Sequence, residues 1–309
     1  MSSATAKKLD DQAGAAAADA ASDVRAEARA QAKAQALDGR ASVSKLDKAH
    51  KSASDAAKQK WHEFTVNVWL TNLNRFEFGP WKQERNKGKS RQFTSDMDIF
   101  AEIIENGAST GVLGYRKELW KDATGMDKRL VMKLFSESLN WRASMDMMVG
   151  RSLQQTIGAR GLPVTCFSIN TNDDDFLIYL ERSAKKWPFM PEVFSFFLMV
   201  NGEPRFYAFH RDVINIGGDY SLVDQHGETV GHVNGAIFTI GGKWHCTVRG
   251  DHADSRLMAV VKLFAGMIAF NREARRHIKA IAQDVRAGRL QPEIQKQETD
   301  LYQNPRRVR

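Results

Sequence analysis

The hydrophobic pattern is clearest between Val193 and Phe270, where short apolar runs alternate with turn residues. The strand-like runs read VFSFFLMV, RFYAFHR, DYSLVD, TVGHV, AIFTI and WHCTV, and the turns between them include NGEP, QHGE, NG and GGK. The Asn201-Gly202 and Asn234-Gly235 pairs favour the positive φ angles that tight hairpins require. Short strands at a spacing of about ten residues are typical of an antiparallel sheet, sandwich or barrel.

A helix follows these runs and is apolar on nearly every face. Its core, Leu257–Phe270, reads LMAVVKLFAGMIAF and is interrupted only by Lys262 and Gly266. This stretch rises about 21 Å, which is shorter than the roughly 30 Å hydrocarbon layer of a bilayer. The chain continues as the charged sequence NREARRHIKAIA. We therefore expect a helix that is buried in protein and lies inside the curved sheet.

Residues 61–162 predict a mixture of strand and helix. The alternation in FTVNVWL indicates a half-buried strand, whereas residues 95–158 have apolar positions at helical spacing. Two helices are predicted there, in DMDIFAEIIENG and in MDKRLVMKLFSESLNWRASMDMMVGRSLQQTI. The second would present a stripe made of Leu130, Leu134, Trp141, Met145 and Met148. Strand-like runs resume in VTCFSIN and FLIYLERS.

The first 60 residues are rich in Ala, Lys, Arg and Asp and contain almost no large apolar side chain. Such a segment forms no core of its own, and we expect a disordered or partly helical arm, with a bundle-forming arm as the alternative. The sequence as a whole predicts an α+β protein in four parts. These are the Ala-rich arm (1–60), a mixed and mainly helical region (61–162), an antiparallel meander or β-barrel around a central helix (163–283) and a basic tail (284–309).

Composition is compatible with a folded protein, because 42% of the 309 residues are hydrophobic. The first residues, MSSATAKKLDDQ, lack the apolar run of a secretory signal, and the acidic pair Asp10-Asp11 argues against a transit peptide. We therefore expect a cytoplasmic protein. Cys166 and Cys246 both lie in strand-like apolar runs, which predicts two reduced, buried thiols.

The formal net charge of +8 is concentrated near the C-terminus. From Arg256 to Arg309 there are twelve lysines and arginines and five acidic residues. This excess would attract a lipid surface, a nucleic acid or an acidic protein, although a solvated helix face is the alternative. A second basic run lies at 82–92. It could contact the phosphates of a nucleic acid, or be a solvated loop, and its candidate residues are Arg85, Lys87, Lys89 and Arg91.

No catalytic or metal-binding pattern accompanies these elements. Five histidines occur between residues 210 and 252, without the spacing of a zinc site, and His245 and Cys246 are expected on opposite faces of a strand. Asp173, Asp174 and Asp175 are consecutive, whereas a calcium loop places its ligands at alternate positions. Nucleophile-elbow, phosphate-loop and dinucleotide-binding motifs are absent from the sequence. We predict a protein that is not an enzyme and has no cofactor or metal.

The stretch GGDYSLVDQHGETVGHVNGAIFTIGGKWHCTV, followed by a polar turn and the apolar helix, resembles the tubby-like C-terminal superfamily, in particular its LURP-one-related and phospholipid-scramblase branch. The resemblance covers about residues 190–275. The positions that match the family's strand, D-x-x-G turn and following strands are Tyr220, Asp224, Gly227, Val230 and Val233. The family fold is a β-barrel closed around a central hydrophobic helix, which implies that Leu257–Phe270 fills the barrel.

This resemblance implies a binding protein, with anionic lipid head groups as the best-known ligand of the tubby branch. Four cations that flank the predicted turns are candidates for binding the anion, by charge alone: Arg205, Arg211, Lys243 and Arg249. The alternative is that they are charges that discourage aggregation of edge strands. We thus expect a noncatalytic binding or scaffold protein, peripheral at an anionic membrane or bound to an acidic protein. The alternatives are nucleic-acid binding and a structural role in a homo-oligomer or larger assembly.

Overall fold

The computed structural model divides the chain into two units, residues 1–59 and 60–309. It describes residues 60–68, 92–94, 96–172, 176–184, 191–212, 218–235 and 242–303. The predicted arm up to residue 59, the predicted strand AIFTI and the three consecutive aspartates at 173–175 lie outside the described residues.

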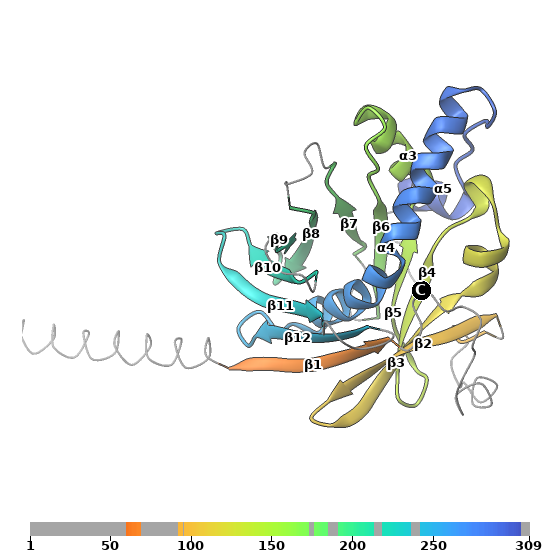
Figure 1. Cartoon of the computed structure of the whole chain (residues 1–309). Helices are drawn as coiled ribbons and strands as arrows, with labels where there is room; N and C mark the ends of the chain where they lie inside the picture. Colours follow the sequence, from red (N-terminus) through yellow and green to blue (C-terminus); the bar gives the residue numbers. More distant parts are fainter. Residues whose placement is uncertain are drawn as a thin grey trace, which may run out of the picture. The chain divides into compact units, whose positions relative to one another are not determined.

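Twelve described strands form one closed antiparallel barrel in the order β1-β12-β11-β10-β9-β8-β7-β6-β5-β4-β3-β2 (Figure 1). The strands are β1 (Trp61–Val68), β2 (Met97–Glu105), β3 (Ala108–Arg116), β4 (Val131–Ser136), β5 (Trp141–Met147), β6 (Cys166–Thr171), β7 (Ile178–Arg182), β8 (Val193–Val200), β9 (Glu203–Arg211), β10 (Tyr220–Asp224), β11 (Thr229–Gly235) and β12 (Lys243–Arg249). Each strand pairs with its neighbours in sequence, and β1 closes the barrel by pairing with β12 from Trp61↔Arg249 to Asn67↔Lys243.

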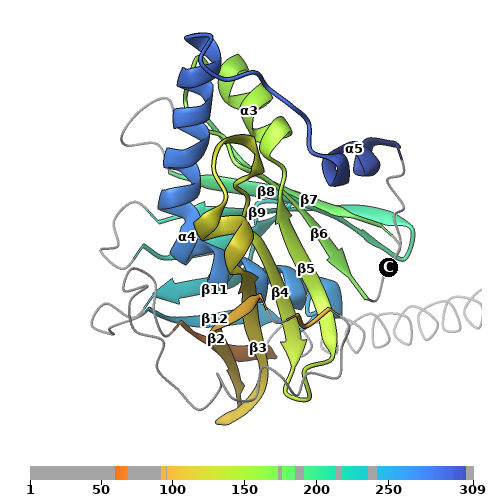
Figure 2. The ribbon, with the colours of Figure 1, turned by 90° about the vertical axis from the view of Figure 1, so that its right-hand side faces the viewer.

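The part of the chain that the structure describes has few helices. A π-helical turn (Glu118–Asp122) and a 3-10 turn (Gly125–Asp127) connect β3 to β4, α3 (Val149–Gly158) follows β5, and α4 (Ser255–Arg286) and α5 (Lys296–Gln303) follow β12. Figures 1 and 2 show α4 starting among the strands and leaving the barrel at the end where α3 lies. Asp254 begins α4 as its N-cap, since its side chain accepts a hydrogen bond from the backbone N–H of Arg256.

The first half of α4 fills the barrel, as the continuous apolar run predicted. The Phe264 ring stacks on Phe209 of β9 at 3.8 Å between centroids. Two residues later, and therefore on the opposite face of the helix, Gly266 faces Leu113 of β3 and Met132 of β4 on the other side of the barrel. Because side chains of both sides meet α4 within one buried cluster, the helix and the sheet share a single core.

The prediction of a mainly helical region before the barrel is wrong. Much of the stretch 97–147, where two helices were predicted, forms strands β2 to β5, and among the described residues before 162 only α3 and the two short turns are helical. The proposed boundary at 162/163 therefore falls inside the barrel, because β1 to β5 close the same sheet as β6 to β12. The physical reason is that the meander begun at residue 193 needs further strands to bury both sides of α4.

Of the predicted turns NGEP, QHGE and NG, the first two are confirmed. Asn201 and Gly202 have φ angles of 54° and 82° between β8 and β9, and Gly227 has a φ of 78° between β10 and β11. The third prediction is wrong, because Asn234 and Gly235 continue β11 and pair with His245 and Trp244 of β12.

The region predicted as a basic tail begins inside α4 and then contains α5, which packs on α3. Glu298 is 3% exposed and accepts hydrogen bonds from the backbone N–H groups of Gly150 and Arg151, at 2.9 and 2.7 Å. These are unsatisfied donors in the first turn of α3, so the carboxylate caps that helix. The described part of this region is therefore ordered on the barrel.

Candidate anion-binding surface

The antiparallel order separates the four predicted cations into two pairs. Arg205 at the start of β9 and Arg249 at the end of β12 lie at one end of the barrel, which also holds the turn at 201–202 and the first residue of α4. We call it the turn end. Arg211 and Lys243 lie at the opposite end, where α4 leaves the barrel, which we call the exit end. The four side chains therefore do not form one site.

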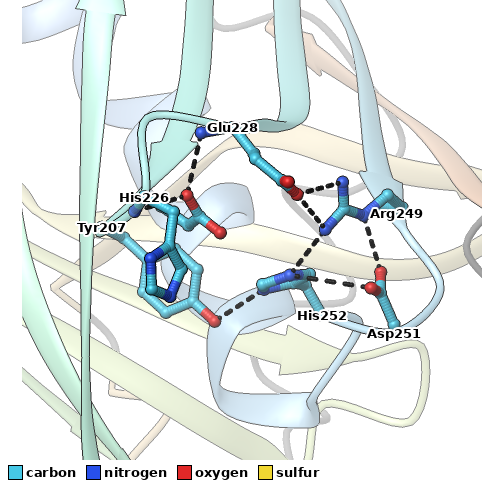
Figure 3. A network of polar contacts seen from close by, with 7 residues as sticks. Tyr207, His226, Glu228, Arg249, Asp251 and His252 are labelled. Carbon is cyan, nitrogen blue, oxygen red and sulfur yellow. Dashed lines mark hydrogen bonds and ion pairs between the residues drawn. The ribbon is translucent and has the colours of Figure 1, made fainter.

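At the turn end, acidic neighbours compensate the charge of Arg249 (Figure 3). Its two Nη atoms donate to Glu228 Oε2 at 3.2 Å, and its Nε donates to Asp251 Oδ1 at 2.8 Å. The side chain is only 13% exposed. Arg249 thus joins β12, the β10–β11 turn and the segment before α4, and its charge is already matched.

His252 is held between Arg249 and Tyr207 in the same network (Figure 3). Its Nε2 lies 3.0 Å from Arg249 Nη2, and its Nδ1 lies 3.0 Å from the Tyr207 hydroxyl. A guanidinium only donates, so Nε2 accepts and the neutral ring carries its proton on Nδ1. Burial lowers the pKa of His252, which favours this neutral form. With both nitrogens engaged, the ring is a structural link.

At the exit end, one buried carboxylate lies among three guanidinium groups. Glu192, which is 2% exposed, forms an ion pair with Arg182, and its oxygens lie 4.0 Å from Arg211 Nη1 and 3.9 Å from Arg275 Nη1. Tyr220 donates to Glu192 Oε2 at 2.8 Å. One negative charge faces three positive charges, so the cluster has an excess of two positive charges.

The electrostatics of this cluster favour an ionised Glu192. Burial alone raises the pKa of Glu192, but the Arg182 guanidinium, followed by Arg275 and the Tyr220 hydroxyl, outweighs burial and holds the pKa below its ordinary value. Arg182 is 2% exposed, whereas Arg211 and Arg275 keep 46% and 31% of their side-chain surface in solvent. The uncompensated positive charge is thus presented at the surface by Arg211 and Arg275.

The part of α4 outside the barrel carries a stripe of cations on the same end. Arg272, Arg276 and Lys279 are exposed and follow the i, i+4, i+7 spacing that places side chains on one helix face. In the part of the chain that the structure describes, none of the three has an ion-pair or hydrogen-bond partner. We call these three residues the α4 stripe.

Acidic residues do not neutralise the α4 stripe. The two acids of this half of α4 are already paired, Glu273 with Lys128 at 2.9 Å and Asp284 with Arg289 at 2.6 Å. Lys243 is exposed at the start of β12 on the same end of the barrel. The α4 stripe and Lys243 therefore place solvated positive charge at the exit end. The basic loop with Arg85, Lys87, Lys89 and Arg91 lies outside the described residues.

Sequence reasoning missed the buried half of this cluster. Arg182 and Glu192 are charged residues at strand ends, and no local pattern signals that they face each other. The α4 stripe, in contrast, was available from helical spacing, since Arg272, Arg276 and Lys279 recur at intervals of four and three.

The described residues do not bring nucleophiles or metal ligands together. His245 is exposed and Cys246 is buried on the other face of β12, as predicted from strand alternation. Both cysteines are free thiols, and burial raises the pKa of each, that of Cys166 to about 12. Such thiols are poor nucleophiles at neutral pH. Within the described ranges there is no group of three His, Cys, Asp or Glu side chains able to hold a metal ion.

Comparison with known proteins adds no relative: no family model matches the chain, and no curated protein or solved structure matches it. Among the described helices, none combines the length and apolarity needed to cross a membrane.

Proposed function

We propose that this protein is a noncatalytic binding protein that attaches to an anionic surface through the exit end of its barrel, with lipid head groups as the favoured partner. The observation that carries the proposal is the α4 stripe, whose three cations are exposed and unpaired within the described residues. The excess charge of the Glu192 cluster at Arg211 and Arg275 supports it. The tubby-like relationship is part of the same proposal, and a helix enclosed by a closed barrel supports it.

The expected strength of attachment is modest. A lysine or arginine close to an anionic bilayer contributes about 1 kcal/mol, and the attraction decays within a Debye length of about 8 Å at physiological salt. Three stripe residues with Arg211 and Arg275 would supply several such contributions. The attachment would be peripheral and sensitive to salt.

Flotation of the full chain with vesicles tests this proposal. Neutral phosphatidylcholine vesicles and vesicles that also contain phosphatidylserine would be compared at about 0.15 M salt, with double-stranded DNA as competitor in a parallel tube. We expect flotation only with the anionic vesicles, persistence in the presence of DNA, and loss of flotation in Arg272→Glu/Arg276→Glu/Lys279→Glu.

A matched control keeps the net charge equal and moves the substitutions to the turn end. Lys60→Glu/Arg142→Glu/Arg205→Glu makes the same change in charge there and is expected to float like the unchanged protein. Equal loss in both triple variants would indicate a response to net charge rather than a surface. Binding that DNA abolishes would favour the nucleic-acid alternative. Absence of binding to both vesicles and DNA would favour a role in protein assembly.

A further inference from the structure

The outer wall of the barrel carries a polar cleft that is separate from the exit end. Its floor is formed by the outward side chains of β4, β5 and β6, and its volume is about 290 Å³. Strand register aligns Lys133 with Ser144 and Ser144 with Asn170, so these three side chains form one row across the floor. Gln297 and Leu301 of α5 form part of the wall. The Glu298 cap on α3 holds α5 in this place.

Positive charge and unused donors are concentrated in this cleft. Arg116 donates its Nε to Asp96 at 2.7 Å, and Arg129 donates one Nη to Asp146 at 2.5 Å. Lys133 donates to the side chain and backbone oxygens of Gln92 at 2.7 and 3.2 Å. Each of these cations has further N–H groups, for which the described part of the chain supplies no acceptor. Three cations face two carboxylates, which leaves one positive charge in excess.

The positive charges of these side chains also repel one another. Burial lowers the pKa of Lys133, and the positive charge of Arg116 lowers it further. A bound anion would relieve this repulsion and accept hydrogen bonds from the unused N–H groups. The positive side of the cleft therefore suits a phosphate or carboxylate group.

The rest of the cleft suits hydroxyl groups and a ring. Asp146 Oδ1 is buried and has no hydrogen-bond partner in the described structure, so it can accept from a ligand hydroxyl. Asn170 and Gln297 line the cleft with amides, and Ser144, which accepts from Trp141 Nε1 at 2.8 Å, keeps its own proton to donate. The half-buried Trp141 indole adds an apolar surface.

We infer that this cleft binds a small phosphorylated sugar or polyol, with its phosphate toward Lys133, Arg129 and Arg116 and its hydroxyls toward Asp146 and Asn170. This site shares no residue with the α4 stripe or with the Glu192 cluster. It is therefore independent of the function proposed above, and its failure would leave that proposal unchanged. The cleft volume lies at the lower end of the range for small-molecule sites, which fits a ligand the size of a monosaccharide.

Titration calorimetry of the full chain with glucose 6-phosphate as the probe tests this inference, with glucose and inorganic phosphate in parallel. We expect the sugar phosphate to bind at least about tenfold more tightly than either part alone, because it uses both halves of the cleft. Lys133→Met removes the charge and keeps most of the side-chain volume. Asn170→Asp adds a repelling charge at nearly constant shape. Each is expected to weaken binding about tenfold or more.

Asn67→Asp is the matched control, since Asn67 is a half-exposed strand residue on β1 and receives the same substitution. It should leave the affinity unchanged, and thermal melting would verify that all three variants fold. Asn170→Asp keeps the test valid if Lys133→Met unfolds the protein. No detectable binding of glucose 6-phosphate would overturn the inference. So would equal affinity for inorganic phosphate, or an affinity that neither Lys133→Met nor Asn170→Asp changes.

Discussion

At Gly266, α4 lies close to the barrel wall. A Cβ atom at this position would lie 2.6 Å from Leu113 Cδ1 and 3.0 Å from Met132 Cε. On the other side of the helix, the large ring of Phe264 fills the space toward β8, β9 and β10. The helix thus lies closer to β3 and β4, where Gly266 has no side chain. The Phe264 ring fills the wider space on the opposite side.

Gly266→Val is expected to reduce the free energy of unfolding by about 1–3 kcal/mol, because the added atoms overlap a packed core and force its neighbours to move. Gly158→Val is the control, since Gly158 is also a helical glycine, at the end of α3, but has no atom within 4 Å of an added Cβ. Urea denaturation of both variants measures the difference. Equal stability of the two variants would contradict the close approach of α4 to β3 and β4.

At the scale of single elements, the strands misread as helix have a physical explanation. Two bulges in β2, between Ile99 and Ala101 and between Ile103 and Ile104, interrupt its alternation. Met97 also packs into a second apolar cluster with Phe93, Val112 and Phe135, separate from the barrel core, so β2 buries residues on both faces. Apolar positions at 97, 100 and 103 therefore follow a spacing that resembles a helix turn.

At β4, the spacing of the apolar residues fits both a helix and a strand. Leu130 and Leu134 are four residues apart, which is one helix turn and also two strand repeats. Met132 between them is buried in the same core, and its position identifies a strand. The helix α4 was predictable because a run that is apolar on every face fits only a buried element, and its length favoured a helix.

The contact of α5 with α3 is an element-scale interaction that can be weakened by one change. Glu298→Gln removes the negative charge that faces the first turn of α3 but keeps the shape of the side chain. We expect the free energy of unfolding to fall by about 1 kcal/mol. Hydrogen exchange at the amides of Gly150, Arg151 and α5 should become about fivefold faster.

Glu293→Gln provides the control, because Glu293 is exposed just before α5 and the substitution removes the same charge. Exchange in Glu293→Gln should match that of the unchanged protein. If Glu298→Gln exchanged at the same rate as Glu293→Gln, the carboxylate cap would contribute nothing to the position of α5.

At the scale of the whole molecule, the barrel depends on one long-range seam. Eleven of its strand pairings join neighbours in sequence, while β1 and β12 pair across almost the whole described chain. Local patterns predict strands and hairpins, but nothing in residues 61–68 indicates that residues 243–249 are their partner. The Arg182–Glu192 pair depends instead on the local pairing of β7 with β8, and the sequence does not indicate the register of that pairing.

This seam predicts different outcomes for two truncations. Removal of residues 1–59 leaves every strand of the barrel in place, and we expect a cooperative thermal transition within a few degrees of that of the full chain. Removal of residues 1–68 also deletes β1, which leaves the edges of β2 and β12 unpaired and removes Phe64, Val66 and Val68 from the core. That variant is expected to lose its cooperative transition and to aggregate, because open strand edges pair with other chains. Circular dichroism melting and size-exclusion chromatography of both truncations provide the measurement. A monomeric variant without β1 that melted like the longer truncation would show that the β1–β12 seam is dispensable for the barrel.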